Sequence, residues 1–122
     1  MNSSCTFCRI ASGQAGVPLV YEDARVAAFD DIAPQAPVHV LIVPKTHYTS
    51  LDDAVPEDVL GAIVAAAPIV ARLKGVDETG YRVIVNTGPH ASQTVPHLHL
   101  HVMGGRQMGH CMVWFIDETP GE

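Results

Sequence analysis

Three histidines alternate with apolar residues in the stretch HLHLHVMGG, which runs from His97 to Gly105. Side chains on a β-strand point to opposite faces with a period of two, so His97, His99 and His101 should share one face, roughly 6–7 Å apart. The leucines and the valine between them should share the other face and pack against a core. We therefore expect a strand with chemistry on one side, ending where Gly104 lets the backbone turn tightly.

A row of imidazoles on one face of a strand has three interpretations. The histidines could be polar surface residues that share a face by accident. They could bind zinc, because HxH pairs on strands ligate zinc in many hydrolases. They could also act on phosphate, with one imidazole as the nucleophile and its neighbours as donors to the phosphoryl oxygens. The sequence places no carboxylate beside the row to complete a zinc hydrolase site, which weakens the second interpretation.

The composition describes one domain with a single core, since 48% of the 122 residues are hydrophobic. A net charge of −6 with only seven lysines and arginines argues against a nucleic-acid-binding surface. No segment reaches the roughly 18–20 apolar residues of a membrane span, and the amino-terminal residues lack the apolar core of a signal peptide. Because the three cysteines are an odd number, which fits a reducing compartment, we expect a cytoplasmic protein.

Cys5 and Cys8 form a CxxC pair at the start of a short segment with helical periodicity. A redox dithiol normally follows a strand, and no strand is predicted before Cys5. Two interpretations remain, namely half of a zinc site completed by ligands elsewhere, or two buried thiols that act as small apolar residues. Cys111 stands alone and is expected only to pack.

The remaining pattern predicts strands and one long helix. Strands are expected over 19–22, 26–29, 39–43 and 80–86, a loop over 33–37, and an edge strand over 113–116. The long helix is expected over 53–74, capped by Asp53 and kinked or split at Pro68. A polar loop over 87–96 precedes the histidine strand. Its Ser92, Gln93 and Thr94, with backbone N–H groups, are suited to cradle a phosphate.

The run QTVPHLHLHV, residues 93–102, resembles the signature of the histidine triad (HIT) superfamily. The segments CTFCRIASG, VYED, FDDIAPQAPVHVLIVPKTH and GYRVIVNTG resemble family segments in the same order. This composite over about a hundred residues is far more specific than HxHxH alone. The chain is most similar to the Hint branch, the purine nucleoside phosphoramidases, because GGRQM follows the strand.

The resemblance implies a chemistry that needs no cofactor. His99 would attack the α-phosphorus of a nucleoside 5′-phosphoramidate or acyl-nucleotide, giving a nucleotidyl-histidine that water hydrolyses. His101 would donate to a phosphate oxygen, His97 would complete the triad, and His47 would lie near the active site. The purine nucleotide, a derivative of AMP or GMP, would meet residues matched to phosphate (Ser92, Thr94, Val95), to phosphate and ribose (Asn86), to the ribose hydroxyls (Asp31) and to the base (Phe7, Ile10, Phe29, Ile32).

The resemblance also implies partners for the CxxC pair. Some bacterial relatives that carry these cysteines bind structural zinc, which on this chain gives Cys5, Cys8, His47 and His97 as ligands. Such a Cys₂His₂ site leaves His99 and His101 for phosphate. Zinc and nucleotidyl transfer are therefore compatible.

The implied fold is α+β, a single HIT domain over residues 1–122. It has a five-stranded antiparallel sheet with one long and one short helix, and two subunits join into a ten-stranded sheet. Two departures from the family stand out, Ala91-Ser92 in place of Gly-Gly and a divergent tail over 105–122. The tail reaches the partner's site in the Hint branch, so its change bears on leaving-group preference. Two other functions stay open, a non-catalytic purine-nucleotide-binding partner protein and a zinc-dependent hydrolase.

Overall fold

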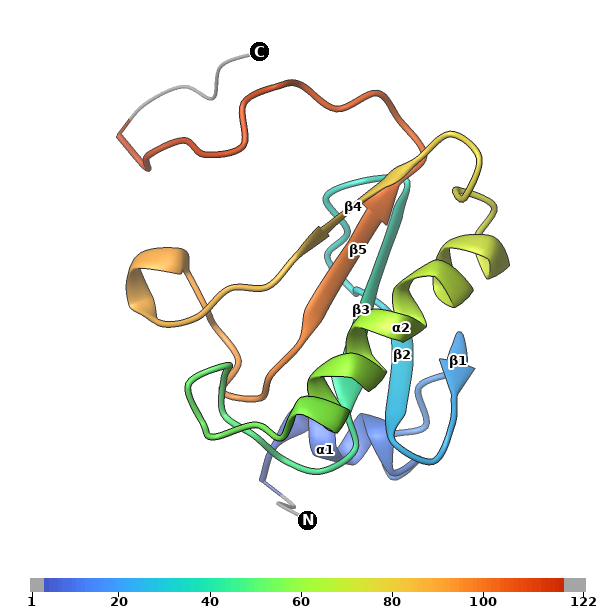
Figure 1. Ribbon diagram of the computed structural model, residues 1–122, viewed down its shortest axis with the longest axis vertical. Coiled ribbons are helices and arrows are strands. Elements are labelled where there is room, and N and C mark those ends of the chain that lie inside the picture. Colours follow the sequence, from blue (N-terminus) through green and yellow to red (C-terminus); the bar gives the residue numbers. More distant parts are fainter. Residues whose placement is uncertain (1–3, 118–122) are drawn as a thin grey trace.

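The computed structural model describes residues 4–117 as one antiparallel sheet with a helix on each face. The elements in chain order are α1 (Thr6–Ala11), β1 (Tyr21–Glu22), β2 (Val26–Asp30), β3 (Val38–Pro44), α2 (Glu57–Leu73), β4 (Tyr81–Ile84), the 3₁₀ turn η1 (Pro89–Ala91) and β5 (Leu100–Gly104). The strands lie in the order β1-β2-β3-β5-β4, so β3 and β5 are central and β4 forms one edge (Figure 1). The predicted α+β fold is confirmed.

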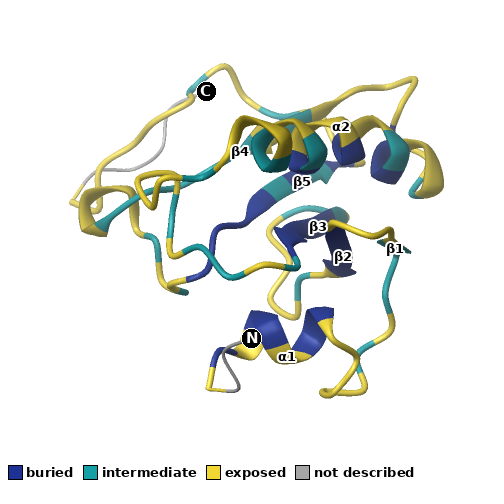
Figure 2. Ribbon diagram, turned by 60° about the horizontal axis from the view of Figure 1, so that its bottom comes forward, coloured by how far each residue is buried: buried dark blue, intermediate teal, exposed yellow. Residues whose placement is uncertain are grey.

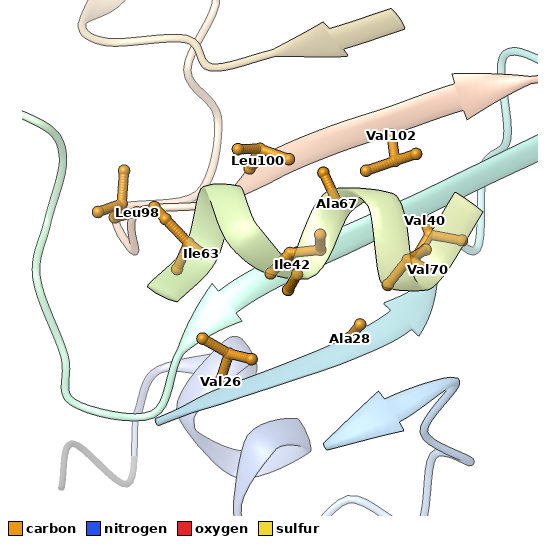
Figure 3. Close-up of a cluster of buried hydrophobic side chains, with 11 residues drawn as sticks. Val26, Ala28, Val40, Ile42, Ile63, Ala67, Val70, Leu98, Leu100 and Val102 are labelled. Atoms are coloured by element: carbon orange, nitrogen blue, oxygen red, sulfur yellow. The ribbon is translucent and has the colours of Figure 1, made fainter. Parts of the chain in front are cut away.

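The two faces of the sheet carry different clusters because neighbouring residues on a strand point to opposite sides. On one face, residues of β2, β3 and β5 pack against α2, as Figure 3 shows for Ile42, Leu100 and Val102 beside Ile63 and Val70. The alternate residues pack against α1 on the other face (Figure 2). That second cluster contains Phe7, Ile10, Ala27, Phe29, Leu41 and Val43. One face is therefore core and the other, beside α1, can hold a site.

The histidine strand is shorter than predicted, because β5 begins at Leu100 rather than at His97. Continuing the register of β3 with β5 would pair Leu98 with Pro44, which has no backbone N–H for the ladder. Leu98 instead donates its backbone N–H to the carbonyl of Tyr48 at 2.6 Å. The alternation survives this break, since Leu98 is buried in the α2 cluster together with Leu100.

The long helix begins at Glu57, and the prediction that Asp53 caps it is wrong. Pro56 occupies the cap position, where its fixed φ of −61° suits the entry into a helix. The Asp53 carboxylate accepts the backbone N–H of Thr49 at 2.8 Å instead. The helix also runs through Pro68 without a break, so the predicted split does not occur. Pro68 lies on its exposed side, where the carbonyl that loses its hydrogen bond can meet water.

The segment after β5 forms no strand within the described residues, so the predicted edge strand over 113–116 is wrong. Figure 1 shows this segment leaving the end of β5 as a long irregular tail. Its start is tied to β4 by a hydrogen bond from Arg82 Nη2 to the carbonyl of Gly109 at 3.1 Å. The half-buried thiol of Cys111 donates to the carbonyl of Val113 at 2.9 Å. Between residues 4 and 117, no helix has the length and apolarity that a bilayer crossing requires.

Candidate active site and adjoining Cys/His cluster

A pocket of about 590 Å³ opens on the α1 face of the sheet, at the start of β5. His99 and His101 line it, together with all nine residues that the resemblance assigns to the nucleotide. Those nine are Phe7, Ile10, Phe29, Asp31, Ile32, Asn86, Ser92, Thr94 and Val95. A hollow of about 660 Å³ between the end of α2 and the tail contains none of the predicted site residues. The fold thus gathers segments far apart in sequence around one cavity.

The other four predicted residues form a separate group behind the pocket. The ligand atoms of Cys5, Cys8, His47 and His97 all lie within 4.8 Å of one another. His97 Nδ1 lies 3.3 Å from Cys5 Sγ and 3.1 Å from His47 Nδ1, and Cys8 Sγ lies 3.2 Å from His47 Nδ1. Cys5 also caps α1, since the backbone N–H of Cys8 donates to its Sγ at 3.5 Å.

This Cys/His cluster has the chemistry and spacing of a closed zinc site. Zinc bonds of about 2.0–2.3 Å to nitrogen and sulfur place tetrahedral ligand atoms about 3.3–3.8 Å apart. The separations in the cluster are close to that range, and both cysteines and His97 are buried. The pair of thiols and pair of imidazoles fill all four positions, which is typical of structural rather than catalytic zinc. The residues present therefore fit the metal.

His97 is held with its lone pair toward the cluster. Its Nε2 lies 3.0 Å from the carbonyl oxygen of Pro44, which can only accept a hydrogen bond, so the proton is on Nε2. Nδ1 is then unprotonated and faces Cys5, Cys8 and His47. Burial lowers the pKa of His97 from 6.5 to about 4, helped by the charges of His47 and His99, so the ring is neutral near pH 7.

His99 is oriented by a similar constraint. Its Nδ1 lies 2.7 Å from the carbonyl oxygen of His97, so Nδ1 carries the proton and Nε2 carries the lone pair. The ring packs against Phe7 in a T-shaped arrangement, with ring centroids 5.1 Å apart. His99 is only 6% exposed, and that small exposure is on the pocket. An imidazole nitrogen with a free lone pair, fixed in a pocket, is suited to nucleophilic attack.

His101 is oriented by His39, a residue that the sequence reasoning placed in a strand but missed as part of a site. The backbone N–H of Gln35 donates to His39 Nδ1 at 3.0 Å, so the proton of neutral His39 is on Nε2. That Nε2–H points at His101 Nδ1, 2.8 Å away, and leaves the proton of His101 on its Nε2. The signal for His39 is its parity, because it shares a strand face with Leu41, which pairs with His101.

The fold also brings a carboxylate close to the triad, which corrects the expectation that none stands there. Asp31 Oδ2 lies 3.5 Å from His39 Nε2, and the ligand atoms of Asp31, His39 and His101 lie within 4.8 Å of one another. A metal ion would need free lone pairs on both imidazoles. The Nε2 of His39 carries a proton and its Nδ1 is occupied by Gln35, so the group fits a hydrogen-bond relay better than a metal site.

Burial also keeps His101 neutral. The pKa of His101 is lowered from 6.5 to about 4, chiefly by burial. Coulombic interaction with His99 and His39 acts in the same direction, while Asp31 opposes them. The rest of the lining has little positive charge, because among the described residues no lysine or arginine lines the pocket. Its two ionisable acids are Asp30, which pairs with Lys74 at 2.9 Å, and Asp31. An anion in the pocket must therefore be held by uncharged donors, namely imidazole, hydroxyl and amide side chains and backbone N–H groups.

The loop between β4 and β5 is held in shape by Gln93. Its Oε1 accepts the backbone N–H of Gly88 at 3.1 Å, and its Nε2 donates to the carbonyls of Thr49 at 2.7 Å and Val95 at 3.0 Å. Ser92 takes a left-handed conformation with φ of 60°. The serine that replaces a family glycine thus keeps a backbone geometry that glycine adopts more easily.

Comparisons with known proteins agree with this geometry. The family model described as "HIT domain" matches residues 13–108. The "Purine nucleoside phosphoramidase" of Escherichia coli K12 is 40% identical over 89% of this chain and 93% of its own. The "14 kDa zinc-binding protein" of Brassica juncea is 44% identical over 84% and 93%. The solved "HIT family hydrolase from Clostridium thermocellum" superposes with a TM-score of 0.87 at 43% identity, covering 93% of this chain and 100% of that structure.

The depressed pKa values of His97 and His101 predict that the metal-free protein loses stability as the pH falls from 6.5 to about 4. In that range the unfolded chain binds protons at both histidines and the folded chain does not, whereas above pH 6.5 neither form does. We expect His101→Asn to remove part of this loss. Urea unfolding in chelator at pH 7, 6 and 5 measures it, with the exposed His90→Asn as a control that keeps the wild-type slope. An unchanged slope in His101→Asn would contradict the prediction.

Proposed function

This chain belongs to the HIT family, and from that premise we propose that it is a nucleotide hydrolase in which His99 becomes covalently nucleotidylated. The substrate is a purine nucleoside 5′-phosphoramidate or acyl-nucleotide, cleaved at the α-phosphate. One observation carries the proposal. The hydrogen bond from His99 Nδ1 to the His97 carbonyl leaves the lone pair of His99 Nε2 in the pocket. His101 presents its Nε2–H on the same side.

The reaction has two displacements at phosphorus. His99 Nε2 attacks the α-phosphorus as the bond to the leaving nitrogen or oxygen breaks. A leaving nitrogen takes a proton from water and departs as an amine, whereas the leaving group of an acyl-nucleotide departs as a carboxylate. The nucleotidyl imidazole then carries a positive charge, which is stabilised by the hydrogen bond from its Nδ1–H to the His97 carbonyl. Water then attacks the same phosphorus and releases a proton to solvent as the bond to Nε2 breaks. The nucleoside monophosphate leaves, and the lone pair returns to His99 Nε2. His101 donates its Nε2–H to a phosphate oxygen throughout.

The pocket lining supports a purine nucleoside as the recognised group. Phe7, Ile10 and Phe29 provide an apolar surface for a flat base at the α1 end. The Asp31 carboxylate accepts the backbone N–H of Ala33 through Oδ1 and keeps further acceptor capacity for ribose hydroxyls. Asn86, Ser92 and Thr94 lie on the phosphate side. The phosphoramidase name of the Escherichia coli relative supports the same reaction class.

Mixing the protein with an adenosine 5′-phosphoramidate and following its intact mass should reveal the intermediate. We expect an AMP-sized adduct that forms quickly and decays as AMP accumulates, and that is absent in His99→Ala because the nucleophile is gone. His90→Ala, which removes an exposed histidine outside the pocket, is the matched control and should behave as wild type. AMP binding without adduct or turnover would instead identify a nucleotide-binding partner protein. Turnover without adduct that stops on metal removal from a still-folded protein would identify a zinc-dependent hydrolase.

We further propose that the Cys/His cluster binds one structural zinc ion. The four ligand atoms and their burial support this, as does the name of the Brassica juncea relative. Zinc would fix α1, which is capped by Cys5 and contains Cys8, against the loops that carry His47 and His97. His99 and His101 take no part, so no catalytic step depends on the metal. The odd number of cysteines further supports a reducing, cytoplasmic compartment for such a thiolate site.

Metal analysis of the purified protein tests the zinc proposal. We expect about one zinc per wild-type chain, and a loss of most of it in Cys8→Ser because a thiolate ligand is removed. Cys111→Ser is the matched control, since Cys111 lies in the tail and not in the cluster, and it should retain the metal. The proposal fails if the wild-type protein, supplied with zinc, retains none after dialysis or if both variants bind zinc equally.

We also propose that two chains join through β4 into a ten-stranded sheet. β4 is an edge strand with a row of unpaired backbone groups, whereas the opposite edge, β1, is only two residues long. Val83 pairs with Val102 and so lies on the α2 side, where it is 41% exposed. Val64 and Leu73 of α2 are exposed to 57% and 58%. A second copy would cover this apolar strip and supply the missing strand partner.

Sedimentation equilibrium tests the dimer. The wild-type protein should sediment at twice its chain mass of 13.0 kDa. Val83→Asp should shift it toward the monomer, because a charge would be buried in the contact. Leu51→Asp places the same charge on an exposed residue of the loop between β3 and α2, outside the proposed contact, and should leave the dimer intact. A monomeric wild-type protein would refute the proposed assembly.

A further inference from the structure

His101 can serve a phosphate only in one of its two neutral tautomers. A proton on Nε2 makes the pocket-facing nitrogen a donor, whereas a proton on Nδ1 makes it an acceptor that repels a phosphate oxygen. The partner of the other ring nitrogen decides between the two forms. For His101 that partner is His39, which is itself an imidazole with two tautomers. The proton on His101 therefore depends on whatever fixes the proton on His39.

We propose that the backbone N–H of Gln35 is the positioning group that sets both tautomers. It donates to His39 Nδ1 at 3.0 Å, and an N–H group cannot accept a hydrogen bond in return. His39 must then carry its proton on Nε2 and donate it to His101 Nδ1 at 2.8 Å. His101 is left with its proton on Nε2, directed at the pocket. We call this chain of hydrogen bonds from Gln35 through His39 to His101 the relay. Its role in catalysis rests on the proposed function, but its existence does not.

The opposite proton arrangement is disfavoured at both ends of His39. A proton on Nδ1 would face the Gln35 N–H, donor against donor. The lone pair then left on Nε2 would lie 3.5 Å from Oδ2 of Asp31, which is also only an acceptor when ionised. His39 is 3% exposed, so water is not at hand to repair either mismatch. Gln35 and Asp31 therefore act in the same direction.

The loop that carries Gln35 is built to keep its N–H in place. Pro34 and Pro37 flank the segment and restrict its backbone. Asp31 anchors its start, accepting the backbone N–H of Ala33 at 2.9 Å and donating its own N–H to the His39 carbonyl at 2.9 Å. Its end packs on Gly105, where an added Cβ would lie 3.0 Å from Cβ of Pro37. The Gln35 side chain takes no part in the relay.

Two substitutions at one position separate the N–H from the side chain. Gln35→Ala removes the side chain and keeps the N–H, whereas Gln35→Pro removes both. In protein labelled with ¹⁵N-histidine, long-range ¹H–¹⁵N spectra distinguish an N–H from a bare ring nitrogen. We expect the Nε2–H form of His39 and His101 in wild type and Gln35→Ala, and a substantial Nδ1–H population in Gln35→Pro. Unchanged tautomers in a folded Gln35→Pro would overturn the proposal.

A second pair of variants covers the case in which Gln35→Pro does not fold. Phenylalanine at position 39 cannot donate to His101, whereas the amide of glutamine can. We expect His101 to gain the Nδ1–H form in His39→Phe and to keep the Nε2–H form in His39→Gln. A pure Nε2–H form of His101 in His39→Phe would show that His39 does not determine the tautomer of His101, and would contradict the proposal.

Turnover of an adenosine 5′-phosphoramidate adds a functional readout. We expect kcat to be lower by at least about tenfold in Gln35→Pro than in Gln35→Ala, and in His39→Phe than in His39→Gln, with KM changing less. The donor matters most as charge develops on the phosphate, which places its effect on kcat. The tautomers are measured in the free protein, so they remain decisive even if the wild-type protein shows no turnover. Equal kcat values within each pair would contradict the catalytic purpose of the relay.

Discussion

A backbone carbonyl can only accept a hydrogen bond, and this constraint determines how two histidines of the site can act. The Pro44 carbonyl accepts a hydrogen bond from the Nε2–H of His97, which directs that ring's lone pair into the Cys/His cluster. The His97 carbonyl accepts a hydrogen bond from the Nδ1–H of His99, which directs the lone pair of His99 into the pocket. The ring of His97 therefore belongs to the Cys/His cluster, and its backbone carbonyl orients His99 in the pocket. The cluster and the pocket are adjacent, but no predicted ligand of the cluster lines the pocket.

The sheet makes this division possible because its side chains alternate. Leu98, Leu100 and Val102 enter the core under α2, while the histidines between them face α1. Pro44 ends the ladder of β3 just where the alternation has to continue without strand pairing. The contact of Leu98 with the Tyr48 carbonyl takes over from the ladder there. The loop after β3 thereby supports the histidine segment and also brings His47 to His97.

Much of the fold could be predicted because periodicity and family resemblance agree on it. The alternating histidines, the amphipathic helix and the apolar strands are local patterns. His39 was missed because its role depends on the register of β3 against β5, which no local pattern encodes. Asp53 was misassigned because it has the chemistry of a cap but Pro56 fixes where the helix begins. The resemblance assigned Asp31 to the ribose, but its contact with His39 arises only through the turn between β2 and β3 and was missed for the same reason.

The sparse positive charge of the pocket bears on how the proposed reaction would end. A nucleoside 5′-phosphoramidate carries one negative charge at the α-phosphate, whereas the monophosphate released from it carries closer to two near pH 7. Uncharged hydrogen-bond donors are suited to the single charge of the substrate. Among the described lining residues, no lysine or arginine is present to neutralise the additional charge of the product. Asp31 also lies in the lining and repels additional negative charge. In the proposed reaction, the electrostatics that accept the substrate would thus favour release of the product, which would free the site for the next substrate.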